Sequence, residues 1–188
     1  MLTATSRLEA VNIMLAAIGA DPVDTIDEAN DVDVANATRL LDKVSKSVQI
    51  RGWDFNTYTL TVQPDLANNN QITWDDTWLK WSCDTTTIVK RNGKIFDFTN
   101  QTYQFTSALT VTAMVALDFE DLPECFREFI AIKAAYDFQA VFMGDQSISQ
   151  DLQVSLQMAE RGLVEYDMSM DTYNMLQLTG IAGNLGRT

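Results

Sequence analysis

Carboxylates are the side chains of this sequence best suited to chemistry, and they stand close together at two places. Asp75 and Asp76 are adjacent, and Glu120, Asp121 and Glu124 fall within one short stretch. Two carboxyl groups can cleave a glycosidic bond, one as general acid and the other as base or nucleophile. The same residue types are common in turns and at helix N-termini, where their oxygens accept backbone N–H bonds. We expect this structural role and no enzymatic activity, and we keep a hydrolase of glycosidic bonds as the alternative function.

The rest of the sequence excludes several other kinds of site. None of the 188 residues is a histidine, which rules out histidine-based triads and histidine metal sites. No phosphate-binding loop or dinucleotide-binding glycine pattern is present. The acidic run from Asp27 to Asp33 lacks the glycine and the distal glutamate of a calcium loop. Cys83 and Cys125 have no metal-ligand spacing, so we expect free or buried thiols in a reducing cytoplasm. The sequence therefore predicts no catalytic residue, no cofactor and no metal.

The formal charge of -13 bears on the kind of partner that the chain binds. A strongly acidic surface repels phosphates, which argues against sequence-specific binding of nucleic acid. Two interpretations stay open: the acids only keep the surface hydrated, or they line a lumen through which DNA slides without sticking. Met1 to Ala20 lacks the pattern of a signal peptide, and no other segment is long and apolar enough to cross a bilayer. We expect a soluble protein without a membrane partner.

Four segments have the periodicity of amphipathic helices. They run from about Ser6 to Ile18, from about Val34 to Arg51, from an N-cap at Asp121 to about Met143, and from about Ser149 to Met168. The third is apolar on more than one side, which predicts the central helix of a bundle. Ser147 or Ser149 is the expected cap of the fourth helix.

Between the second and third helices the pattern changes to that of strands. Thr57 to Val62 and Leu109 to Leu117 alternate apolar and polar residues, and Asn92-Gly93 between two short apolar runs indicates a hairpin. The fold class is therefore α+β, a bundle of about four helices with a small antiparallel β domain inserted over residues 56–119. Residues 1–55 and 120–170 form the bundle, and residues 171–188 form an extended C-terminal tail.

Two groups of apolar residues are candidates for partner interfaces. Trp74, Trp78 and Trp81 form a tryptophan-rich patch, for which we favour a core or a subunit interface over a sugar-binding platform. The tail supplies the second group, Met175, Leu176, Leu178, Ile181 and Leu185. Because ordering the tail costs roughly 1–2 kcal/mol per residue, we expect it to order only on a partner.

Four stretches in chain order also resemble one known family. They are EAVNIMLAAIGADPV (residues 9–23), VANATRLLDKVSKSVQIRGWDFN (34–56), VKRNGKIFDFTNQTYQF (89–105) and LDFEDLPECFREFIAIKAAYDFQ (117–139). Together they resemble the tail tubular protein A family, the head-to-tail adaptors of short-tailed, podovirus-type bacteriophages. The similarity spans about Leu8 to Met175.

The resemblance implies a structural protein of the virion tail that is made in the host cytoplasm. It implies a dodecameric ring between the portal and a tail nozzle similar to tail tubular protein B, with DNA passing through the lumen. Tail fibres are a further partner that it suggests. For the alternative function, the resemblance implies a hydrolase activity carried by a tail protein, with envelope polysaccharide or peptidoglycan as the substrate. We expect the free protein to be a monomer until a portal is available, because many weak contacts in a closed ring reinforce one another.

Overall fold

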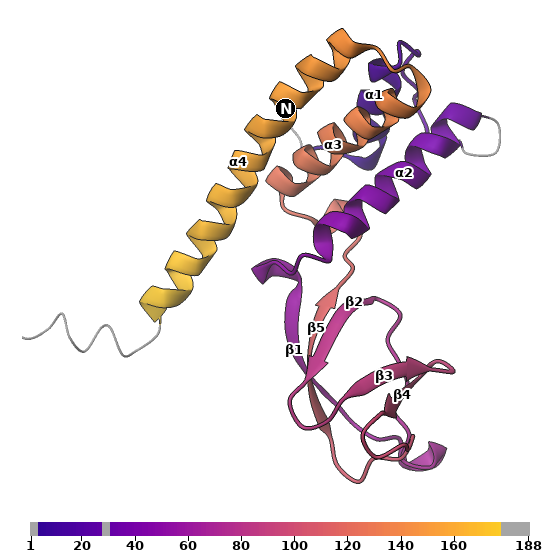
Figure 1. The fold of residues 1–188 in the computed structure, drawn as a ribbon, viewed down its shortest axis with the longest axis vertical. Helices are drawn as coiled ribbons and strands as arrows, with labels where there is room; N and C mark the ends of the chain where they lie inside the picture. The colour runs from indigo at the N-terminus through magenta and orange to yellow at the C-terminus, as the bar shows by residue number, and fades with distance from the viewer. Residues whose placement is uncertain (1–3, 28–30, 178–188) are drawn as a thin grey trace, which may run out of the picture. The chain divides into compact units, whose positions relative to one another are not determined.

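The computed structural model describes residues 4–27 and 31–177, except for the side chains of residues 171–177. The chain divides into two compact units: unit 1 combines Met1–Val48 with Asp118–Thr188, and unit 2 is the segment Gln49–Leu117. Figure 1 shows that unit 1 is helical and that unit 2 consists mainly of strands. The α+β fold class is as predicted, with strands between the second and third helices.

The helices of unit 1 are α1 (Arg7–Ala17), α2 (Val32–Gln49), α3 (Glu124–Phe142) and α4 (Gln146–Gln177). α1 begins as expected, because the Ser6 side chain accepts a 3.1 Å bond from the Glu9 N–H. α2 begins after Asp31, whose Oδ1 accepts from the N–H groups of Asp33 and Val34.

α3 is the central helix of unit 1. It packs against both α1 and α4. Its buried side chains point in several directions and include Phe126, Phe129, Ile130, Ala134 and Phe138. Each fully buried phenylalanine contributes about 1.5–3 kcal/mol to stability relative to an exposed one. The covering of α3 on more than one side explains why no single apolar stripe is visible in its sequence.

The predicted N-cap of α3 at Asp121 is wrong. Phe119–Asp121 form a short 3-10 turn, and the helix begins only at Glu124, after Pro123. A proline disfavours the helical conformation of the residue before it, and Leu122 accordingly has φ -76° and ψ 147°.

Both predicted ends of the fourth helix also need correction. The Asp145 carboxylate, not Ser147 or Ser149, accepts from the N–H groups of Ser147 and Ile148 at the start of α4. At the other end α4 continues to Gln177, because the sequence contains no glycine or proline there before Gly180. Residues 171–177 are therefore helical, whereas we predicted an extended tail from 171.

Unit 2 contains two small antiparallel sheets. β1 (Thr57–Val62), β5 (Leu109–Val115) and β2 (Trp78–Cys83) form the first, with β5 in the centre. β3 (Ile88–Arg91) and β4 (Lys94–Asp97) form a hairpin around Asn92-Gly93, whose φ values are 52° and 68°. Two consecutive positive φ values are what a two-residue hairpin turn requires, so the predicted hairpin is confirmed.

A cluster of buried polar groups joins the two ends of unit 2, and we call it the polar clasp. Gln49 Nε2 donates to the Leu117 carbonyl at 3.0 Å, and Gln49 Oε1 accepts from the Leu117 N–H at 2.7 Å. Asn56 Nδ2 donates to the carbonyls of Gln49 and Val115 at 3.0 and 3.2 Å. Because the side chains of Gln49 and Asn56 are buried, the loss of either one leaves buried partners unsatisfied.

Substituting Gln49→Ala is expected to lower the free energy of unfolding of unit 2 by about 1–3 kcal/mol, because the N–H and C=O of Leu117 lose their partner. Urea unfolding followed by tryptophan fluorescence measures this selectively, since all 4 tryptophans lie in unit 2. Gln63→Ala, at an exposed position of the same unit, is the control. Equal stability of the two variants would show that the polar clasp contributes nothing.

Candidate functional site

The two groups of carboxylates have structural partners nearby. Asp75 Oδ1 accepts from the N–H and the hydroxyl of Thr77, at 2.9 and 2.7 Å, and closes a turn. Its neighbour Asp76 forms an ion pair with Lys90 of β3. Both aspartates are exposed. Asp75 therefore stabilises its own turn, and Asp76 pairs with a neighbouring strand.

Two glutamates near the start of α3, Glu120 and Glu124, hold the N-terminal segment of unit 1. Glu124 accepts from the Thr5 N–H at 2.9 Å and from the Thr5 hydroxyl at 2.6 Å. Glu120 accepts from the Arg7 N–H at 2.9 Å, and its other oxygen lies 3.6 Å from the Arg127 guanidinium. Asp121 is exposed. These contacts join the start of α1 to the start of α3, which is a structural use of both glutamates.

Within residues 4–27 and 31–177, no group of histidine, cysteine, aspartate or glutamate side chains is arranged to hold a metal ion. Over the same part of the chain, no helix is long and apolar enough to cross a bilayer. Cys83 and Cys125 are both free thiols. Burial raises the pKa of the Cys125 thiol, which lowers its reactivity as a nucleophile at neutral pH.

The tryptophan patch lies in the core of unit 2. The Trp74 ring meets those of Trp78 and Trp81 edge-on, with centroid distances of 5.0 and 4.5 Å. Trp74 and Trp78 are buried, and the indole N–H of Trp81 donates to the Ile88 carbonyl at 3.0 Å. The structure thus gives these residues a core role, and their role at a partner interface stays a prediction.

The predicted interface residues of the tail fall in two places. Met175 and Leu176 lie within α4, while Leu178, Ile181 and Leu185 lie outside the described residues. Their contact with a partner also stays a prediction.

Asp97 at the end of β4 is a buried carboxylate that sequence reasoning missed. It accepts from the Thr86 hydroxyl at 2.7 Å and from the backbone and side-chain N–H groups of Asn100, each at 2.8 Å. Burial alone raises the pKa of this carboxyl, but the hydrogen bonds outweigh it and the pKa lies below the usual value. The Asp-x-x-Asn spacing after a strand was the available signal, since aspartate often accepts N–H bonds in the following turn.

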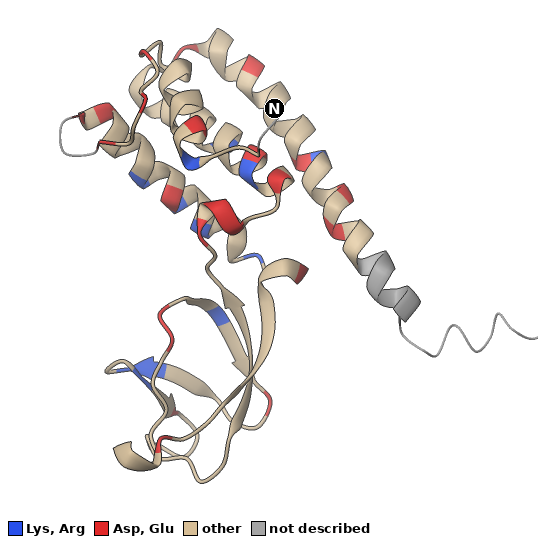
Figure 2. Cartoon of the chain, turned by 180° about the vertical axis from the view of Figure 1, so that it is seen from behind, with Lys and Arg blue, Asp and Glu red and all other residues tan. Residues whose placement is uncertain are grey.

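The charge of the chain is divided unevenly between the two units. Unit 1 contains 20 acidic and 8 basic residues, a net charge of -12, while unit 2 contains 6 and 5, a net charge of -1. Figure 2 shows acidic residues on every helix of unit 1. The acidic character of the protein therefore belongs to the helical unit.

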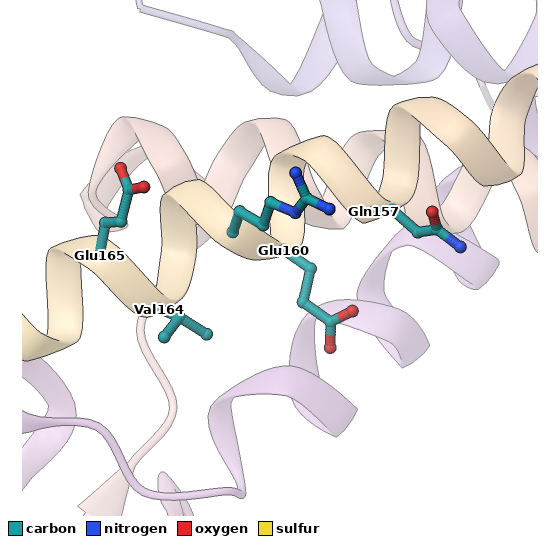
Figure 3. Close-up of a pocket in the computed structure, with 5 residues that line it drawn as sticks. Gln157, Glu160, Val164 and Glu165 are labelled. Atoms are coloured by element: carbon teal, nitrogen blue, oxygen red, sulfur yellow. The ribbon is translucent and has the colours of Figure 1, made fainter.

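Figure 3 shows a hollow along α4. Its described lining residues are Gln157, Glu160, Arg161, Val164 and Glu165, which all belong to this helix. Among these residues, polar groups do not converge from different elements as they do around a small-molecule substrate. The described part of the hollow is a surface of mixed charged and apolar side chains.

Comparison with known proteins supports a structural role. The family model described as tail tubular protein matches residues 8–173, which include residues of both units. A relative named "Tail tubular protein A", from Klebsiella phage KP34, is 25% identical over 155 residues, covering 82% of this chain and 81% of the relative. The resemblance seen in the sequence is thereby confirmed.

The Asp97 network predicts a specific dependence of stability on pH. Since the pKa of Asp97 is lower in the folded than in the unfolded chain, the ionised carboxylate stabilises unit 2 above the unfolded pKa. This stabilisation is lost as the pH falls below about 4 and through the folded pKa. Asp97→Asn should lower the free energy of unfolding at pH 7 by about 1.5–3 kcal/mol and flatten its acid dependence.

Urea unfolding followed by tryptophan fluorescence at a series of pH values tests this expectation. Asp65→Asn is the matched control, because Asp65 is an exposed aspartate of the same unit whose carboxylate also accepts a backbone N–H, that of Ala67. An acid dependence of Asp97→Asn equal to that of the unsubstituted chain would contradict the assignment.

Proposed function

The chain belongs to the tail tubular protein family, and from this premise we propose that it is a structural protein of a phage tail that acts as a head-to-tail adaptor. Copies of the chain form a ring between the portal and the tail nozzle, and DNA passes through the ring. The observation that carries the proposal is the family match over residues 8–173. An adaptor contacts one partner on each side, and the two units of this chain can each supply one of these contacts.

The carboxylate contacts support a non-enzymatic role. The candidate acids accept bonds from Thr77, Thr5 and Arg7, or pair with Lys90, and so serve the fold locally. A glycosidase needs two carboxyl groups that face each other across the scissile bond. No contact among the described residues favours the hydrolase alternative.

The division of charge is compatible with passage of DNA. A net charge of -12 on the helical unit repels phosphates, and repulsion keeps a moving polymer from binding to the wall. We propose that part of this acidic surface faces the lumen of the ring.

The arrangement of partners follows from the same proposal. The helical unit and the C-terminal residues meet the portal, and unit 2 meets the nozzle or the tail fibres. A ring requires heterologous contacts, in which one patch of each copy meets a different patch of the next. Twelve copies held at many points bind firmly through weak individual contacts, so a free chain can stay monomeric until the portal orders the copies around it.

Mixing the purified chain with a portal ring tests the proposal. We expect a monomer alone and a stacked ring of one added copy per portal subunit after mixing, measured by native mass spectrometry and negative-stain images. The bound copies should dissociate on disruption of the portal ring, because the avidity is then lost.

Bovine serum albumin mixed with the same portal is the control for unspecific attachment. A chain that ignores the portal and releases reducing ends from host envelope polysaccharide would contradict the adaptor function and support the hydrolase alternative.

A further inference from the structure

The helices of unit 1 differ in the sign of their charge. α4 contains 5 acidic residues and 1 basic residue, whereas α2 contains 3 basic and 2 acidic residues. α2 is the one helix among the four described whose net charge is positive. Figure 2 shows basic residues on α2 and acidic residues along α4. The surface of this acidic unit therefore contains one basic region.

The basic region lies beside an apolar groove between α2 and α3. Leu40 and Val44 of α2 and Ala140 and Val141 of α3 supply the apolar lining. Val141 is 75% exposed. An exposed apolar lining of this kind favours a partner that removes it from water.

Lysines stand at both sides of this groove. Lys43 comes from α2, and Lys133 comes from α3, where it pairs with Asp137 at 3.4 Å. Arg39 and Lys46 extend the basic ridge along the exposed face of α2. Among the described residues, Arg39, Lys43 and Lys46 form no ion pair, so their charges are available to a partner.

The exposed face of α4 has the complementary character. On the side away from the buried residues Ala159 and Leu163, α4 carries exposed apolar side chains. Val154, Val164 and Met168 are 52%, 47% and 64% exposed. Glu160, Arg161 and Glu165 border this apolar stripe and line the same hollow as Val164. With two acids and one base, the stripe has an excess of negative charge, which complements an apolar groove lined by two lysines and Asp137.

We propose that the exposed face of α4 in one copy of the chain docks into the α2–α3 groove of a second copy. The contact deepens the adaptor function proposed above and rests on it. The groove and the α4 face are different patches of the same unit, so the contact is heterologous. Each copy can therefore place its α4 in the groove of one neighbour and bind the α4 of another neighbour in its own groove. A chain of such contacts closes into a ring if the rotation between copies permits.

Disulfide trapping between two single-cysteine variants tests the contact without a portal. In a chain carrying Cys83→Ser and Cys125→Ser, one variant has Val141→Cys in the groove and the other has Val164→Cys on the exposed face of α4. The two are mixed in equal amounts in a glutathione redox buffer. We expect the mixed disulfide to exceed the proportion given by random collision, with both homodisulfides depleted.

A matched variant controls for exposure. Val32 is 74% exposed, nearly the same as Val141, and it lies at the start of α2, two turns before the groove. Val32→Cys should therefore give only the random proportion with Val164→Cys. Adding Lys43→Glu to the groove variant should lower the excess of mixed disulfide by roughly two- to fivefold. Lys80→Glu, at an exposed position of unit 2, should leave it unchanged.

Crosslinking of the unsubstituted chain provides a test that does not depend on cysteine variants. A zero-length carboxyl-to-amine reagent, applied to a mixture of light and heavy isotope-labelled chains, should join Lys43 or Lys133 of one copy to Glu160 or Glu165 of another. Mass spectrometry identifies links between copies by their mixed isotope content.

A random distribution of disulfides, together with no such cross-link, would overturn the contact. An excess of the homodisulfide between two Val141→Cys chains would also overturn it, because it would indicate an isologous dimer. In either case a chain that still joins the portal retains the adaptor function, and the groove is then a site for portal or nozzle.

Discussion

The polar clasp is the contact on which the two-unit organisation depends. An insertion into a helical unit must begin and end at nearly the same place, since the helices on either side of it share one core. Gln49 and Leu117 meet this requirement through two hydrogen bonds, and Asn56 adds a bond to each end of the segment. The two bonds between Gln49 and Leu117 join residues 68 positions apart, so they form only when unit 2 has closed. The clasp thus couples the folding of the insertion to the joining of its ends.

The two units differ in the composition of their cores and in their net charge. Unit 2 has a core of tryptophan, isoleucine and other apolar side chains and a net charge near zero. Unit 1 concentrates the negative charge, and the basic ridge of α2 interrupts it beside an exposed apolar groove. Because like charges repel, the proposed association between copies of unit 1 is favoured where opposite charges are brought together. The proposed contact between α4 and the α2–α3 groove brings such opposite charges together.

Local signals in the sequence were sufficient for much of the fold. Ser6 and Glu9 marked the start of α1, Asn92-Gly93 marked the hairpin, and alternation over Thr57–Val62 marked β1. The errors lay where a competing local effect decided the outcome: Pro123 delayed α3, and Asp145 replaced the serines as the cap of α4. The clasp and the groove depend on residues that only the tertiary fold brings together, whereas the bonds of Asp97 to Asn100 are local and were missed. No periodicity of a single segment contains that information.

The most direct measurement of the central claim is a reconstruction of the assembled phage vertex by electron cryomicroscopy. We expect a ring of this chain between portal and nozzle, with α4 of each copy lying in the α2–α3 groove of the next and acidic surface facing the lumen. The chain's absence from this position, or a ring whose copies meet only through unit 2, would contradict it.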